Sequence, residues 1–157
     1  GGGFTPEFDV NGTGGGGPAT PYEIDRVHAR VVNALRAHLG NKAENAPRSE
    51  MRPDLYIRGP DGQMQILFEV KGCSSYQSWF TAIGQLLVYG AGEAKAPKRV
   101  LVCPSEIQSP NFKAALNDLG IMVVTFDERP GQPVSFAGLD AVLATIAATP
   151  SKRKAGR

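Results

Sequence analysis

Apolar residues follow two patterns along this chain, helical spacing in some segments and short continuous runs in others. Where an apolar residue recurs every three or four positions we expect an amphipathic helix, and short runs rich in branched and aromatic residues predict β-strands. The predicted helices span residues 21–39, 76–91, 111–119 and 138–148. The predicted strands span residues 54–57, 65–71, 98–103 and 121–126. Because helices alternate with apolar runs, the chain is predicted to be an α/β protein with parallel strands joined by crossovers.

The first helix has clear start and stop signals. Thr20 is predicted to cap it, with Pro21 at its first position and Glu23 completing a capping box, and Gly40 ends it. His28 falls within the apolar stripe, so we expect its side chain to point inward. No clear strand is apparent between Gly40 and Arg52, so the first strand of the sheet is brief or the sheet begins later.

The first two strands predict a β-hairpin. Residues 59–62 read Gly-Pro-Asp-Gly, a strong turn signal. An antiparallel hairpin about this turn pairs residues whose numbers sum to about 121–123. Asp54 is then opposite the region of Glu69, and Glu69 shares a face with Lys71 because side chains alternate along a strand.

This pairing brings two acids and a lysine together on one side of the hairpin. Two carboxylates held close repel each other unless a cation offsets their charge. Mg²⁺ prefers oxygen ligands such as these, and a neighbouring lysine can orient water or stabilise charge on a phosphate. The alternative is an ordinary surface hairpin with a Glu-Lys ion pair.

The motif Pro53-Asp54 followed by Glu69-Val70-Lys71 resembles the signature of the PD-(D/E)xK nuclease superfamily. Gln85 and Tyr89, in the run Gln-Leu-Leu-Val-Tyr, match the QxxxY motif of its RecB-like branch. The resemblance spans roughly residues 20–127 and implies a restriction-endonuclease-like core, with a mixed central β-sheet flanked by helices.

The resemblance also implies roles for these residues. Asp54, Glu69 and the Val70 carbonyl would bind Mg²⁺ or Mn²⁺, and Lys71 would position or activate the attacking water. Gln85 and Tyr89 lie four residues apart on one helix surface, where they would organise the site and the substrate backbone. A helix flank with a half-buried tyrosine is the alternative for this pair.

A ligand from the first helix is also implied by the resemblance. RecB-like nucleases often use a histidine there, and other branches use a glutamate. His28 is the candidate, although a histidine on an apolar face is more often a core residue. Glu23 is the rival, and the sequence does not decide between them. His38 is interpreted as structural.

Composition adds limits to this picture. The chain has 157 residues, enough for one domain, and a formal charge of +2, which is weak evidence for nucleic-acid binding. We expect a glycine-rich flexible tail or linker over residues 1–18, a nuclease-like domain over 19–150 and a basic tail over 151–157. The two cysteines, Cys73 and Cys103, have no zinc-like spacing and are expected to be reduced. No signal peptide or membrane-spanning run is visible, so we expect a cytoplasmic protein without a membrane partner.

The sequence therefore predicts a metal-dependent nuclease that hydrolyses phosphodiester bonds with a metal-activated water, in DNA rather than RNA. Three alternatives stay open: a toxin or effector nuclease acting on DNA or tRNA, with a larger parent protein and an immunity partner; a catalytically inert nucleic-acid-binding domain; and a structural α/β domain. The sequence does not distinguish endonuclease from exonuclease activity, or indicate sequence specificity, oligomeric state or pathway.

Overall fold

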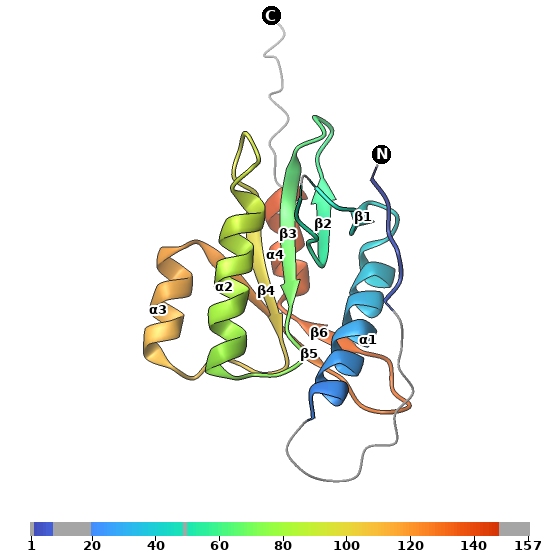
Figure 1. Cartoon of the computed structure of the whole chain (residues 1–157), viewed down its shortest axis with the longest axis vertical. Helices are drawn as coiled ribbons and strands as arrows, with labels where there is room; N and C mark the ends of the chain where they lie inside the picture. Colours follow the sequence, from blue (N-terminus) through green and yellow to red (C-terminus); the bar gives the residue numbers. More distant parts are fainter. Residues whose placement is uncertain (1, 8–19, 49, 148–157) are drawn as a thin grey trace, which may run out of the picture.

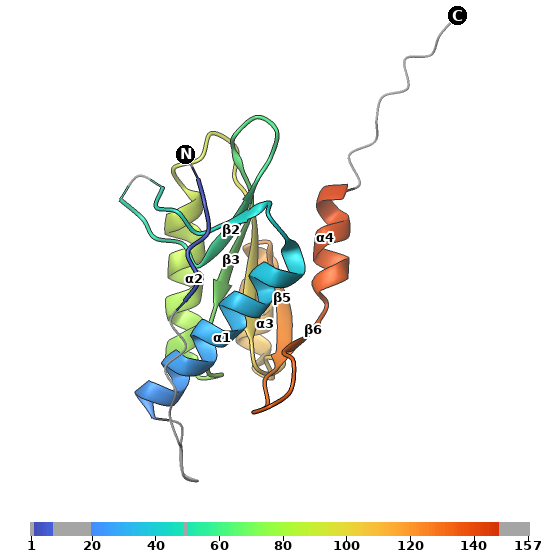
Figure 2. The ribbon, with the colours of Figure 1, turned by 90° about the vertical axis from the view of Figure 1, so that its right-hand side faces the viewer.

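A mixed β-sheet of six strands forms the centre of the computed structural model, which describes residues 2–7, 20–48 and 50–147. Helices cover both faces of this sheet, as Figures 1 and 2 show. The helices are α1 (Pro21–Leu39), α2 (Tyr76–Gly90), α3 (Pro110–Asp118) and α4 (Leu139–Ala147). The strands are β1 (Ala43–Glu44), β2 (Leu55–Arg58), β3 (Met64–Val70), β4 (Lys98–Cys103), β5 (Ile121–Asp127) and β6 (Ser135–Ala137). This is an α/β fold consistent with the predicted restriction-endonuclease-like core.

The strands are arranged in chain order, β1-β2-β3-β4-β5-β6. β1, β2 and β3 pair antiparallel, β3, β4 and β5 pair parallel, and β6 returns antiparallel to β5. Within the hairpin Leu55 is opposite Phe68, so the next position along brings Asp54 beside Glu69. The predicted register is therefore confirmed.

Each face of the sheet has its own hydrophobic core. α1 and α4 cover one face, where their buried side chains pack on alternate residues of β2 to β5, including Leu55, Phe68, Val70 and Val102. α2 and α3 cover the other face, where they pack on Tyr56, Leu67, Leu101 and Cys103. Since side chains alternate along β3, the Glu69 side chain lies on the same face of the sheet as Leu67.

The ends of α1 agree with the prediction. The Thr20 side chain accepts a hydrogen bond from the Glu23 backbone N–H, and the Glu23 carboxylate accepts one from the Thr20 N–H. Gly40 follows the last turn with a φ of 80°, a conformation that glycine adopts without strain. The capping box therefore fixes where the helix begins, and with it the position of the residues one or two turns later.

The two outermost strands differ from the prediction. β1 has two residues and is the brief first strand that the sequence left open. β6 has three residues and was not predicted. Both are too short to show a period-2 pattern, and they form through pairing with the longer neighbours β2 and β5.

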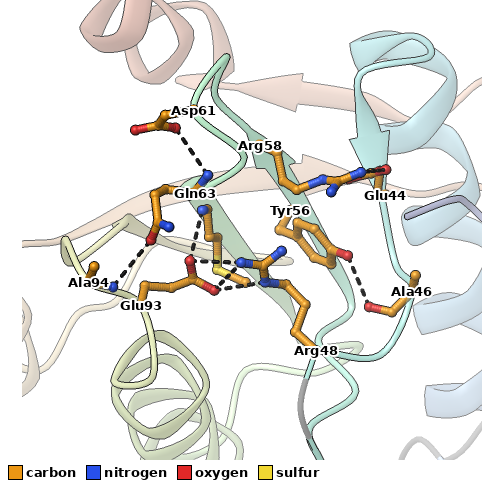
Figure 3. A network of polar contacts seen from close by, with 10 residues as sticks. Glu44, Ala46, Arg48, Tyr56, Arg58, Asp61, Gln63, Glu93 and Ala94 are labelled. Carbon is orange, nitrogen blue, oxygen red and sulfur yellow. Dashed lines mark hydrogen bonds and ion pairs between the residues drawn. The ribbon is translucent and has the colours of Figure 1, made fainter. Parts of the chain in front are cut away.

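Ion pairs hold the turn end of the hairpin (Figure 3). Arg48 donates to both oxygens of Glu93 at 2.7 and 2.8 Å, and Glu93 also accepts from the Met64 N–H at 3.0 Å. Arg58 donates to both oxygens of Glu44 at 2.6 and 2.8 Å. Two-point contacts of this kind fix geometry as well as adding energy. They join the loop after β1, the hairpin and the α2–β4 loop; we call these two pairs the hairpin latch.

Residues 2–7, which the sequence analysis placed in the tail, hydrogen-bond to the domain. The Thr5 backbone exchanges hydrogen bonds with the Asn45 side chain, and the Glu7 backbone does so with Asn33 of α1. Residues 8–19 and the predicted basic tail, 151–157, lie outside the described residues. Among the described residues, no helix is both long and apolar enough to span a membrane.

Candidate active site

The open end of the β2–β3 hairpin, opposite its turn, forms one wall of a surface cleft of about 550 Å³. β3 contributes Glu69 and Val70 to this cleft, α1 contributes His28, and α2 contributes Gln85. The full lining is Pro21, Ile24, Asp25, His28, Asp54, Glu69, Val70, Lys71, Gly72, Cys73, Ser75, Gln77, Ser78, Thr81 and Gln85. The structure therefore brings most of the predicted site residues to one place.

Glu69 is the least exposed of these polar residues, with 2% of its surface accessible. Its Oε1 lies 3.2 Å from the Lys71 ammonium, but its Oε2 is buried with no hydrogen-bond partner among the described residues. Burial, and next the negative charge of Asp54, raise the pKa of Glu69 to about 9. A buried carboxyl oxygen without a partner is costly, so this group is arranged for something other than stability.

Asp54 is held from two sides. Its Oδ1 lies 3.1 Å from His28 Nε2, and its Oδ2 accepts a hydrogen bond from the Val70 N–H at 2.8 Å. Burial favours the neutral form of this carboxyl, but His28 and the Val70 N–H outweigh it and lower the pKa of Asp54 below its usual value. Asp54 is thus charged while Glu69 beside it holds its proton.

His28 is coupled to the same carboxylate. Burial alone would lower the pKa of His28, but the hydrogen bond and the charge of Asp54 more than reverse this, so the pKa of His28 is raised. The predicted inward orientation of this side chain agrees with its contact to Asp54, and 27% of it stays exposed.

Lys71 is positioned by a short chain of side-chain contacts along α2. Its ammonium donates to Gln85 Oε1 at 2.6 Å, and the Gln85 amide donates to the Tyr89 hydroxyl at 3.3 Å. Because α2 is a regular helix, Gln85 and Tyr89 lie one turn apart on the same surface. Tyr89 does not line the cleft; it lies behind Gln85 and orients the amide that holds Lys71.

The two candidates on the first helix occupy different places. His28 reaches the cleft and contacts Asp54, whereas the Glu23 carboxylate accepts from the Thr20 N–H and is not part of the cleft lining. His38 lies near the other end of α1, where it is half exposed, 3.9 Å from Asp140. The geometry therefore associates His28, and not Glu23, with the two carboxyl groups.

Sequence reasoning missed the role of Gly72. A Cβ at this position would lie 2.4 Å from the Ile24 carbonyl oxygen of α1, closer than real contacts allow. Gly72 therefore lets the end of β3 pass against α1, which brings His28 and Asp54 together. A glycine directly after the Glu-Val-Lys motif was the available signal. Asp25, which also lines the cleft, carried no such signal.

The donor atoms fit a hard divalent cation better than a soft one. In the described part of the chain, no three His, Cys, Asp or Glu side chains gather into a ready-made metal cage. Two neighbouring carboxyl groups and a strand-end carbonyl match the sparse protein ligation that Mg²⁺ uses, with water completing its shell. The unpartnered Oε2 of Glu69 is the observation that supports the fit, because a cation would satisfy it and offset the repulsion from Asp54.

Comparisons with known proteins give one distant structural similarity. No family model and no curated protein matches the chain. A crystal structure of the YaeQ protein from Xanthomonas axonopodis pv. citri aligns with a TM-score of 0.33 and 13% sequence identity. The alignment covers 63% of this chain and 55% of YaeQ, so this chain spans about half the length of that protein.

Proposed function

We propose that this protein is a metal-dependent nuclease of the PD-(D/E)xK type, with its active site in the cleft between α1, the open end of the hairpin and α2. The observation that carries the proposal is the Glu69 carboxyl. It is buried beside Asp54, retains an oxygen that makes no hydrogen bond to any described residue, and has a pKa raised to about 9. Groups kept in so unfavourable a setting within a cleft are typical of functional sites.

Each residue has a distinct part in the proposed reaction. Asp54, Glu69 and the Val70 carbonyl would hold Mg²⁺ or Mn²⁺, which when bound supplies charge neutralisation at the phosphate and favours deprotonation of water. Lys71 lies 3.2 Å from Glu69, so its ammonium would stabilise the negative charge that a phosphate gains at this site. Gln85 holds the ammonium of Lys71 through Oε1, and Tyr89 fixes the amide of Gln85.

His28 has two available roles in this scheme. It holds Asp54 by a 3.1 Å contact, which keeps the carboxylate charged and oriented. As a further metal ligand it would exchange that contact for the cation, because the same Nε2 makes both. Either role predicts a weaker cation affinity for His28→Ala, since second contacts of this kind tune metal sites.

The cleft also indicates how a nucleic acid would be held. Lys71 and His28 are the basic side chains of its lining, so few phosphates are contacted there directly. DNA is proposed as the substrate in preference to RNA. A cytoplasmic location is also proposed; such a compartment would keep the unbridged Cys73 and Cys103 reduced.

Cleavage of labelled single-stranded DNA, duplex DNA, plasmid and tRNA in Mg²⁺, Mn²⁺ or EDTA tests this proposal. Wild type is expected to cut at least one DNA substrate only when metal is present, and Lys71→Ala to cut at least about 100-fold more slowly. Lys113→Ala, at an exposed position of α3, is the matched control and is expected to cut like wild type. Equal rates for Lys71→Ala and Lys113→Ala, or cutting that persists in EDTA, would exclude the proposed site.

A further inference from the structure

Helix α2 has an exposed face without charge. None of the fifteen residues of Tyr76–Gly90 is acidic or basic, although the helix lies on the outside of the molecule, where Figure 1 shows it in front of the sheet. Tyr76, Phe80 and Val88 are 62%, 63% and 54% exposed. Large apolar side chains that gather on an uncharged surface mark an interaction site rather than an ordinary solvent-facing helix.

These side chains form one ridge together with a glycine. Tyr76, Phe80, Gly84 and Val88 are spaced four residues apart, so they lie one above the other along the helix. We call these four residues the α2 ridge. Ridges with this spacing are the ones that interdigitate when two helices pack across each other.

Gly84 has no role within its own chain that would require a glycine. A Cβ added there would meet nothing within 4 Å, and its φ is not in the left-handed region. Glycine in the middle of a helix is nevertheless unfavourable compared with alanine. The missing side chain therefore lets an outside body approach the helix backbone closely, at the centre of the ridge.

The rings of the ridge are already held in place. Tyr76 stacks on Phe112 of α3 with ring centroids 5.4 Å apart, and Phe80 packs against the same ring at 4.9 Å. Exposed side chains that are fixed in advance lose little conformational entropy when they become buried. The ridge is therefore prepared for binding.

We propose that the α2 ridge binds a second copy of this chain, with the two α2 helices crossing in antiparallel sense about a two-fold axis and Gly84 facing Gly84. A second copy meets no like charge on this face, whereas a nucleic acid would require basic groups that α2 lacks. The antiparallel sense places Phe80 opposite the smaller Val88 of the partner, on both sides of the closely approaching glycines. In this antiparallel arrangement the two helix dipoles point in opposite directions.

The available area sets the strength of this association. Each exposed ring offers about 100–150 Å², and the whole face offers roughly 500 Å² per copy. The dimer would then bury roughly 1,000 Å², at the lower end of specific interfaces, so we expect an association that depends on protein concentration.

The arrangement has a consequence for the cleft, and this consequence alone rests on the proposed function. Gln85 lies on the flank of α2 beside the ridge and points to the cleft. A two-fold axis perpendicular to the antiparallel helix pair keeps corresponding flanks on the same side. Both clefts therefore open in the same direction, next to each other, where one nucleic acid can reach both.

Sedimentation velocity of the full chain, from about 1 to about 200 µM, tests the association without reference to cleavage. Wild type is expected to shift from monomer to dimer over this range. Phe80→Glu is expected to weaken the dimer at least about ten-fold, because it buries an unpaired charge against the apolar Val88 of the partner. Leu119→Glu is the matched control: it introduces the same charge at another exposed apolar position, after α3, and is expected to leave the dimer unchanged.

Gly84→Ala separates the interface from folding. It is expected to raise the melting temperature of the monomer by a few degrees, because alanine favours the helix, and to weaken the dimer about ten-fold. Wild type that stays monomeric at the highest concentration would overturn the proposal. The proposal would also be overturned if Phe80→Glu dimerised as strongly as wild type, or if the wild-type protein bound oligonucleotides and formed no dimer.

Discussion

The buried carboxyl groups at the two ends of the β2–β3 hairpin are paired differently. At the turn end, Glu93 and Glu44 each meet an arginine through two hydrogen bonds, in the hairpin latch of Figure 3. At the open end, Glu69 and Asp54 lie beside each other, and Oε2 of Glu69 has no partner among the described residues. The same hairpin thus has carboxylates with both oxygens paired at one end and, at the other, a buried carboxyl group that keeps one oxygen unpaired among the described residues.

The difference separates what holds the fold from what serves a site. The Arg48–Glu93 pair satisfies both of its charges and ties three segments together, so it is accounted for by structure alone. The Glu69–Asp54 pair is costly when both groups are charged, because burial raises the pKa of Glu69 and the charge of Asp54 adds to this rise. Local conflict of this kind, in an otherwise consistent fold, is expected at functional sites.

The largest expected effect is on catalysis, at the open end. Glu69→Gln keeps the size of the side chain but removes its charge, so we expect cleavage to fall by at least about 1,000-fold while the protein stays folded. Single-turnover rates measure this loss, and circular dichroism checks the fold. Glu93→Gln makes the same change in the latch and is expected to keep the rate within about ten-fold of wild type. Equal losses in the two variants would remove the distinction between the ends.

The next effect is on stability, at the turn end. Arg48→Ala leaves the Glu93 carboxylate, which is 7% exposed, without its main partner. We expect the free energy of unfolding to fall by about 1–3 kcal/mol, as measured by urea denaturation. Arg129→Ala is the control, because its pair with Asp127 is 72% and 55% exposed and surface pairs contribute about 1 kcal/mol at most. The comparison fails if the two variants are equally stable.

The smallest effect is a pH dependence in EDTA. Folded Glu69 keeps its proton up to a pH of about 9, whereas its ordinary pKa is 4.5. Between these values the native state binds a proton that the unfolded state has released, so stability falls as pH rises. Glu69→Gln lacks this titration. The melting temperature of the variant minus that of wild type is therefore expected to rise from low to high pH. A difference in melting temperature between the two proteins that does not change with pH would contradict the raised pKa of Glu69.

The sequence predicted most of what is local. The cap at Thr20 and the register of the hairpin are confirmed, because each depends on residues close in sequence and on strong turn or capping signals. The convergence of Glu69 and Lys71 on one face followed from strand alternation alone. The pairing of Gln85 with Lys71 needed the motif, because it joins a helix to a strand 14 residues away.

What the sequence did not predict depends on distant contacts. Arg48 and Glu93 are 45 residues apart, and no local pattern indicates that they meet. β6 exists only because β5 offers an edge to pair with. The need for glycine at position 72 comes from α1, which passes within 2.4 Å of where a Cβ would be. These features follow from packing, which periodicity does not encode.

Isothermal titration calorimetry of Mn²⁺ binding at pH 7.5, in buffers of different ionisation enthalpy, tests the central claim most directly. The claim is that Glu69 and Asp54 form a cation site in which the fold leaves a buried carboxyl oxygen of Glu69 without a hydrogen-bond partner among the described residues. Since Glu69 has a pKa of about 9, binding is predicted to release about one proton per ion, and Glu69→Gln is predicted to lose both the binding and the proton. Absence of saturable binding in wild type, or equal binding with no proton release in both proteins, would contradict the account.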